Sequence, residues 1–203
     1  MRSRKHFQFS SGRAVLFLGI VLWPMIAWGH AESGEAGGFL SGMSHPVSGL
    51  DHVVAMIAVG LWGAQLGMPA IWILPVAFPM MMAVGGMLGL IGAPLPGVEI
   101  GIALSAIVLG ALVLGRIRVP LAAAVIIVGF FAIFHGHAHG TELPTGQNAL
   151  LYSLGFVIAT GLLHAVGIAI GYIQRWDLGS RVLRVAGGLV LVAGLYFLWG
   201  GVG

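Results

Sequence analysis

The sequence contains no cysteine, and this absence excludes disulfide bonds, thiolate metal sites and iron–sulfur clusters. Charged residues are scarce as well: they make up 7% of the chain, whereas a soluble domain carries roughly 25%. The sequence also lacks a GxxxxGK[ST] run, so nucleotide-driven pumping is not predicted. The 203 residues are 59% hydrophobic, with a mean hydropathy of +1.03, which is the composition of an integral membrane protein.

The few cations are concentrated at the N-terminus, where four of the nine precede an apolar run over residues 14–26. Residues 27–29, Ala-Trp-Gly, then give a small-x-small cleavage pattern. Residues 1–29 are therefore predicted to be a cleavable signal peptide, with an uncleaved signal anchor as the alternative. Cleavage would leave His30 as the N-terminus of a chain with five cations and six acids. The pI near 10 thus gives no reason to expect a nucleic-acid partner.

Six further apolar stretches are long enough to cross the hydrocarbon core of a bilayer, which takes about 20 helical residues. They cover residues 46–66, 71–92, 98–115, 119–135, 149–172 and 182–201. Backbone groups in lipid must be hydrogen-bonded within the protein, which a helix achieves by itself. The sequence therefore predicts an all-α integral membrane protein in which residues 30–203 form one bundle of six transmembrane helices.

The positions of the remaining cations predict the topology. Each lies in or just beyond the connection between the third and fourth spans or between the fifth and sixth spans, whereas residues 92–97 and 135–148 contain none. Positively charged residues are retained on the cytoplasmic side of a membrane. We therefore expect a multi-pass protein of the bacterial cytoplasmic (inner) membrane with both mature termini on the exported side. A homo-oligomer is compatible with this arrangement.

A polar segment, HPVSGLDH, interrupts the apolar sequence at residues 45–52. An aspartate at the centre of a transmembrane helix costs on the order of 2.5–3.5 kcal/mol, so such residues are functional by default. Asp51 is therefore predicted to face the interior of the bundle or a cavity. The structural alternative is that it only pairs with a neighbouring helix or caps one.

The two histidines of this segment raise a question of geometry. Pro46 predicts a helix that begins there, because its missing N–H does no harm at a first position. In a regular helix His45 and His52 would share a stripe but lie about 10 Å apart, too far for one ion with bonds near 2 Å. Either Gly49 unwinds the helix and brings them together, or the two histidines serve successive stations on a path.

The second polar segment, HGHAHGTE, covers residues 135–142 at the outer end of the fourth span. In a helix His135 and His139 form an i, i+4 pair suited to one metal ion, and Glu142 lies about one turn beyond. His137 would point away unless the glycines open the backbone. A histidine-rich solvent loop is the alternative, although such tracts usually indicate metal binding.

The ligand types narrow the choice of metal. Imidazole and carboxylate without thiolate suit nickel, cobalt and zinc. Met80 to Met82 could supply thioethers to copper, but methionine in a transmembrane helix is more often a packing residue. His30 at the freed N-terminus, His164 in the fifth span and Glu99 at the start of the third are further candidate ligands.

HPVSGLDHVVAMIAVGLWGAQLG (45–67) and FHGHAHGTELP (134–144) resemble the two signature regions of the HupE/UreJ family of hydrogenase- and urease-associated membrane proteins. The resemblance covers essentially the whole chain, signal peptide and six spans included. It implies a nickel or cobalt permease that supplies such metalloenzymes, with zinc a less fitting cargo and no organic cofactor. Carried over residue by residue, it implicates His45, Asp51, His52, His135, His139 and Glu142.

The residues and the resemblance together give the hypothesis of a permease, not an enzyme, for uptake of divalent nickel or cobalt into the cytoplasm. The candidate metal ligands are His30, His45, Asp51, His52, His135, His137, His139, Glu142 and His164. Two rival functions remain at this stage. One is an intramembrane metal-dependent hydrolase that uses Asp51 or Glu142 as its base. The other is a metal sensor or store that transports nothing.

Overall fold

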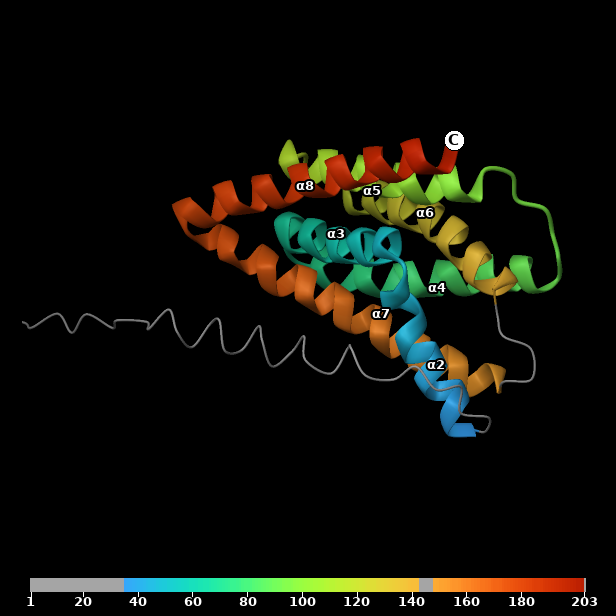
Figure 1. The fold of residues 1–203 in the computed structure, drawn as a ribbon. Helices are drawn as coiled ribbons and strands as arrows, with labels where there is room; N and C mark the ends of the chain where they lie inside the picture. The colour runs from blue at the N-terminus through green and yellow to red at the C-terminus, as the bar shows by residue number, and fades with distance from the viewer. Residues whose placement is uncertain (1–34, 143–147, 203) are drawn as a thin grey trace, which may run out of the picture. The chain divides into compact units, whose positions relative to one another are not determined.

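The computed structural model describes residues 35–142 and 148–202, so the predicted signal peptide and His30 lie outside the described residues (Figure 1). Within these ranges the chain is all-helical. The helices are α2 (Glu35–Ser48), α3 (Leu50–Leu66), α4 (Ala70–Leu90), α5 (Val98–Leu114), α6 (Leu121–Thr141), α7 (Ala149–Gly171) and α8 (Asp177–Val202), with a short 3₁₀ helix, η2 (Tyr172–Arg175), between the last two.

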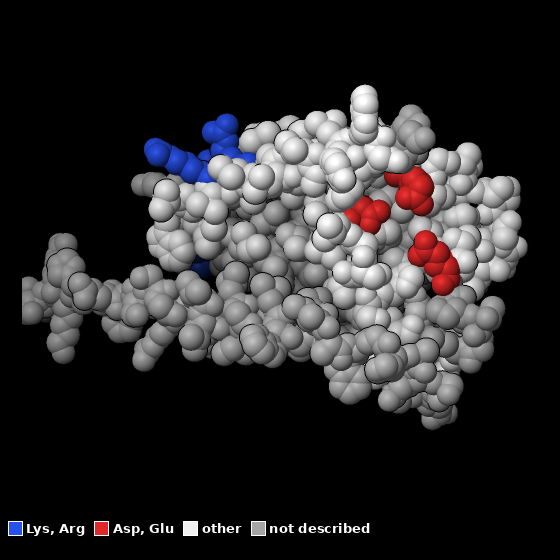
Figure 2. Space-filling model, in the orientation of Figure 1, with Lys and Arg blue, Asp and Glu red and all other residues white. Residues whose placement is uncertain are grey.

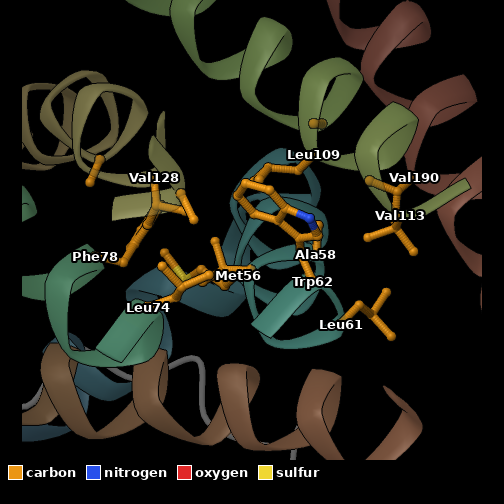
Figure 3. Close-up of a cluster of buried hydrophobic side chains, with 14 of the residues drawn as sticks. Met56, Ala58, Leu61, Trp62, Leu74, Phe78, Leu109, Val113, Val128 and Val190 are labelled. Atoms are coloured by element: carbon orange, nitrogen blue, oxygen red, sulfur yellow. The ribbon is translucent and has the colours of Figure 1, made fainter. Parts of the chain in front are cut away.

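Helix α3 is the centre of the bundle and packs against α4, α5 and α7. Nearly every residue of α3 from Ala55 to Gln65 is buried, in keeping with an apolar sequence that has no single polar face. Figure 3 shows Trp62 and Met56 of α3 surrounded by side chains of neighbouring helices. A central helix enclosed in this way holds any polar group on its surface away from lipid.

Glycines bring α4 and α6 into backbone contact. A Cβ atom added to Gly136 would collide with the carbonyl oxygen of Met82, and one added to Gly140 would collide with that of Gly86. Small residues at four-residue spacing allow transmembrane helices to approach closely in this manner. The face of α6 that carries the two glycines is thereby fixed against α4, and this fixes where the histidines between them point.

Four helical segments of the described chain are long and apolar enough to cross a membrane: α4, α6, α7 together with η2, and α8. Helices α2 and α3 pass the same test only as one broken span, bent by 82°. Helix α5 is a shorter apolar helix of 17 residues. The prediction of a multi-pass helical membrane protein is confirmed, whereas the count of six spans stays a prediction.

The predicted helix start at Pro46 is wrong. Helix α2 already begins at Glu35 and contains Pro46 in its last turn, where the missing N–H leaves free only the carbonyl one turn earlier. The helix ends at Ser48, because Gly49 is extended, with φ −101° and ψ 116°, and α3 starts at Leu50. His45 and His52 therefore lie on two helices rather than on one stripe.

The predicted end of the fourth span at residue 135 is also wrong. Helix α6 continues to Thr141, and His135, His137 and His139 are all buried in it. The contact with α4 through Gly136 and Gly140 holds this last part of the helix inside the bundle. The alternative of a histidine-rich solvent loop is therefore excluded.

Apart from Asp177 at the start of α8, the charged residues described below are segregated between the two ends of the bundle. Asp51 and Glu99 lie in the first turns of α3 and α5, and Glu142 follows the last residue of α6. The described arginines are in the α5–α6 connection and around the start of α8: Arg116, Arg118, Arg175, Arg181 and Arg184. Figure 2 shows acidic side chains gathered at one end of the visible face and basic ones at the opposite end. We call these the acidic end and the basic end.

Candidate metal site

The break at Gly49 brings His45 and His52 to the same partner on α6. The ring centroid of His139 lies 4.7 Å from that of His45 and 4.3 Å from that of His52. Two histidines that a straight helix would separate are therefore brought against one imidazole. Of the two alternatives left open by the sequence, the structure favours the one in which Gly49 interrupts the helix.

Helix α6 contributes a second imidazole to this group. At 100° per residue, His135 and His139 share one face of α6, while Gly136 and Gly140 occupy the neighbouring face. The ring of His135 lies 4.8 Å from that of His52, centroid to centroid. We call His45, His52, His135 and His139 the histidine cluster.

Asp51 holds the ring of His52 in place. Its Oδ1 accepts the backbone N–H of His52 at 2.8 Å and lies 2.9 Å from the Nδ1 of the same residue. A Cβ atom on Gly49 would stand only 2.7 Å from this oxygen, so a larger residue there would displace the carboxylate from its position beside His52. With Nδ1–H donating to Asp51, the buried and unpartnered Nε2 of His52 keeps a free lone pair. Carboxylates commonly orient metal-binding histidines in this way.

Ser105 of α5 does the same for His135. Its hydroxyl donates to the carbonyl oxygen of Ile102 at 2.6 Å and lies 2.9 Å from the Nε2 of His135. Because the hydroxyl hydrogen is used, the hydrogen bond to His135 requires Nε2–H as donor. The buried Nδ1 of His135 has no partner and is left with its lone pair. Nothing in the amino-acid sequence distinguishes Ser105 from the other residues of this apolar helix.

Glu142 closes the cluster at the acidic end. Its Oε2 lies 3.2 Å from the Nε2 of His45. One ligand atom each from His45, His139 and Glu142 fall within 4.8 Å of one another. Ligands on opposite sides of one ion with bonds near 2 Å are about 4 Å apart, so small side-chain movements would let these three bind a single cation.

Two aromatic side chains of α7 line the cluster. The ring of Phe156 lies 4.4 Å from that of His139, and the ring of Tyr152 lies 5.8 Å from that of His45. Both aromatic residues are buried. A wall of this kind limits the access of water, which strengthens electrostatic attraction between a cation and the carboxylates. Neither residue could be identified from the sequence, because aromatic residues in an apolar span are not distinguished from packing residues.

An open groove of about 420 Å³ lies beside Asp51, next to the cluster, and is lined by residues of α5 and α8. Its lining includes Asp51, Glu99 and Tyr196. The side chain of Asp51 is 25% exposed, so the same carboxylate that orients His52 is accessible from this groove. Glu99, a further candidate ligand from the sequence, thus shares this groove with Asp51 rather than contacting the histidine cluster.

Two predicted ligands lie outside the cluster. The Nε2 of His137 is 2.8 Å from the backbone carbonyl oxygen of Ala93, so this ring points away from the cluster toward the α4–α5 connection. His164 lies deeper on α7, beyond the ring of Phe78, whose centroid is 5.5 Å from that of His135 and 5.4 Å from that of His164. His30, the remaining predicted ligand, lies outside the described part of the chain.

The donor set has a definite chemical character. The cluster offers four imidazoles with a carboxylate at each side and no thiolate, a combination that suits borderline divalent cations such as nickel, cobalt and zinc. Several of its ring nitrogens are buried and unpartnered. Buried polar atoms normally have a hydrogen-bond partner, and a bound ion accounts for exceptions of this kind.

Comparison with known proteins agrees with the two sequence motifs. The family described as "HupE / UreJ protein" matches residues 18–197. "Protein HupE" from Rhizobium leguminosarum bv. viciae is 49% identical over 178 residues, which is 87% of this chain and 92% of that protein. No solved structure matches the chain.

Proposed function

The chain belongs to the HupE/UreJ family, and from this relationship we propose that it is a membrane permease that admits Ni²⁺, or Co²⁺, into the cytoplasm. In this role it would supply metalloenzymes such as hydrogenase or urease and would catalyse no reaction itself. The observation that carries the proposal is the histidine cluster: four imidazoles from three helices meet inside an apolar bundle, with Asp51 and Glu142 beside them.

The arrangement of charge supports a path for cations that enters at the acidic end. Asp51, Glu99 and Glu142 lie at that end, where they attract divalent cations and repel anions. The cluster would then replace part of the hydration shell of the ion, while Asp51 and Glu142 offset its charge. We propose that the acidic end faces the exported side and the basic end the cytoplasm, in accordance with the positive-inside rule.

Such a permease needs no energy source of its own. A divalent cation that crosses about 100 mV, negative inside, gains roughly 4.6 kcal/mol, twice the value for a single charge. This corresponds to a gradient of about a thousandfold or more. Passage requires that the ion bind well enough to enter and weakly enough to leave.

Two substitutions at the cluster test the assignment. Asp51→Asn removes the charge that orients His52, and His52→Ala removes an imidazole of the cluster. We expect nickel uptake, measured in cells and in proteoliposomes, to fall about 10- to 100-fold in Asp51→Asn and at least as much in His52→Ala. Wild-type accumulation by both variants would contradict transport through this site.

The same measurements separate the two rival functions from a permease. A metal-dependent hydrolase predicts turnover of lipid or peptide that requires metal and occurs without ion flux. A sensor or store predicts nickel binding by the purified protein with no flux into proteoliposomes. Flux in the wild type that is lost in both variants is expected only from a permease that uses the cluster.

Acidification should weaken uptake. An imidazole binds a metal only in its neutral form, so protons compete with the ion as the pH is lowered. We expect the nickel concentration for half-maximal uptake, measured at constant membrane potential, to rise as the pH is lowered. A nickel affinity that improves on acidification would argue against histidine ligands.

A further inference from the structure

Two polar side chains of α7 are buried beyond the histidine cluster without a side-chain partner. His164 is 1% exposed and Thr160 is 0% exposed; the hydroxyl of Thr160 forms no hydrogen bond, and the ring of His164 interacts only with the main chain of Pro75. Thr160 and His164 are four positions apart in the helix, so both lie on the same face of α7. Burying a polar group without a partner is unfavourable. In a protein that conducts ions, a bound cation would supply the missing partner.

Helix α4 presents a free backbone oxygen to the same place. Pro79 has no N–H, so the carbonyl of Pro75, one turn earlier, lacks the helical hydrogen bond that it would otherwise accept. The ring of His164 interacts with the main chain of Pro75. The imidazole of His164 and the carbonyl oxygen of Pro75, which lacks its helical partner, therefore face each other between α4 and α7.

Phe78 connects this place with the histidine cluster. Its ring is fully buried and lies near the rings of both His135 and His164, at centroid distances of 5.5 and 5.4 Å. On α7, Thr160 follows Phe156 of the cluster wall by four residues, or about 6 Å along the helix, and His164 follows by the same step again. The polar groups of α7 thus continue from the cluster toward the basic end.

We propose that His164, the hydroxyl of Thr160 and the carbonyl oxygen of Pro75 form a second metal-binding site, which we call the inner site. This inference rests on the proposed function above and specifies its path: the cation passes from the histidine cluster, past Phe78, to the inner site. The inner site has one imidazole and two uncharged oxygens and no carboxylate. It therefore binds a divalent cation more weakly than the cluster does, which favours release toward the cytoplasm.

The inner site is tested with the full-length protein, with nickel flux into proteoliposomes and Co²⁺ titration in detergent as the two measurements. His164→Ala should reduce flux about tenfold or more, a loss typical of a removed ligand, while the dissociation constant of the first Co²⁺ equivalent stays unchanged. A second, weaker Co²⁺ equivalent seen in the wild type should be lost. Thr160→Val, which keeps the shape of the side chain, should show the same pattern to a smaller degree.

A pair of proline substitutions in α4 tests the carbonyl. Pro79→Ala restores the N–H that bonds the carbonyl of Pro75, so flux and the second equivalent should both fall. Pro75→Ala also removes a helix proline, but it leaves the carbonyl of residue 75 free, so its loss should be clearly smaller. Equal losses in the two variants would contradict a role for this oxygen, because a change in the helix kink would then explain them.

The possible results of these experiments distinguish failure of the inner site from failure of the permease assignment. If the wild type shows no nickel flux, the permease assignment fails and the inner site fails with it. If the wild type transports nickel and His164→Ala and Thr160→Val, both eluting as monodisperse protein, transport it equally well, the permease stands and the inner site is refuted. Loss of flux together with loss of the first Co²⁺ equivalent would also refute it, since the cluster itself would then be damaged.

Discussion

Replacing His139 by alanine should abolish high-affinity nickel binding and reduce uptake about 100-fold, the largest functional effect expected of any single substitution in the described chain. His139 is the imidazole that contacts both His45 and His52, and it belongs to the three-ligand group with His45 and Glu142. Its removal would leave ligands on α2 and α3 without the residue that joins them. The measurements are calorimetric titration of the purified protein with Ni²⁺ and initial uptake in cells.

The matched control is His137→Gln, two residues away in the same helix. The ring of His137 points toward the carbonyl oxygen of Ala93, and a glutamine amide can keep that hydrogen bond. This variant should bind nickel like the wild type, although it too removes a buried histidine of the HGHAHG run. Equal losses in both variants would show that the histidine run acts as a whole, and wild-type binding in His139→Ala would refute the cluster.

The arrangement of α6 could be predicted from the sequence because it depends on a local rule. The helical period alone places His135 and His139 on one face and His137 on another, and the structure has this arrangement. The all-helical membrane architecture could be predicted for a similar reason, since apolar length decides it. In both cases the determining interactions lie within one or two turns of the chain.

The bend between α2 and α3 could not be predicted in the same way. Pro46 is a common first residue of a helix, yet α2 runs through it, because an N–H missing in the last turn costs one hydrogen bond in a helix already packed on α7. At the residue that ends the helix, Gly49, the Asp51 carboxylate occupies the space of a Cβ while it is bonded to His52. The position of that carboxylate depends on the ring of His52, which packs against His135 and His139 of another helix, so the local sequence alone does not show it.

Residues that contact the cluster from other helices were missed for the same reason. Ser105, Tyr152 and Phe156 are ordinary residues of apolar spans in the sequence, and their role comes from which helices are neighbours. Phe78 likewise gains its position between two histidines only through the packing of α4 against α6 and α7. Neighbour relations of this kind depend on glycine contacts far apart in the sequence.

The Gly136→Val substitution should cause a large loss of stability. A Cβ at Gly136 would collide with the carbonyl oxygen of Met82, a backbone atom that no side-chain rotation can move. Inserting carbon atoms into a packed interior costs about 1–3 kcal/mol where side chains can adjust, and more where backbones must separate. We expect a large drop in the monodisperse yield after detergent extraction and a lower midpoint of thermal unfolding.

Gly161→Val is the matched control for this substitution, because a Cβ at Gly161 meets nothing within 4 Å. It makes the same chemical change in a transmembrane helix, so a normal yield and unfolding midpoint would assign the loss in Gly136→Val to the α4–α6 contact. Any folded Gly136→Val protein should also bind nickel weakly, since separation of α6 from α4 turns His135 and His139 away from His52. A stable variant with wild-type nickel affinity would show that this glycine contact does not position the cluster.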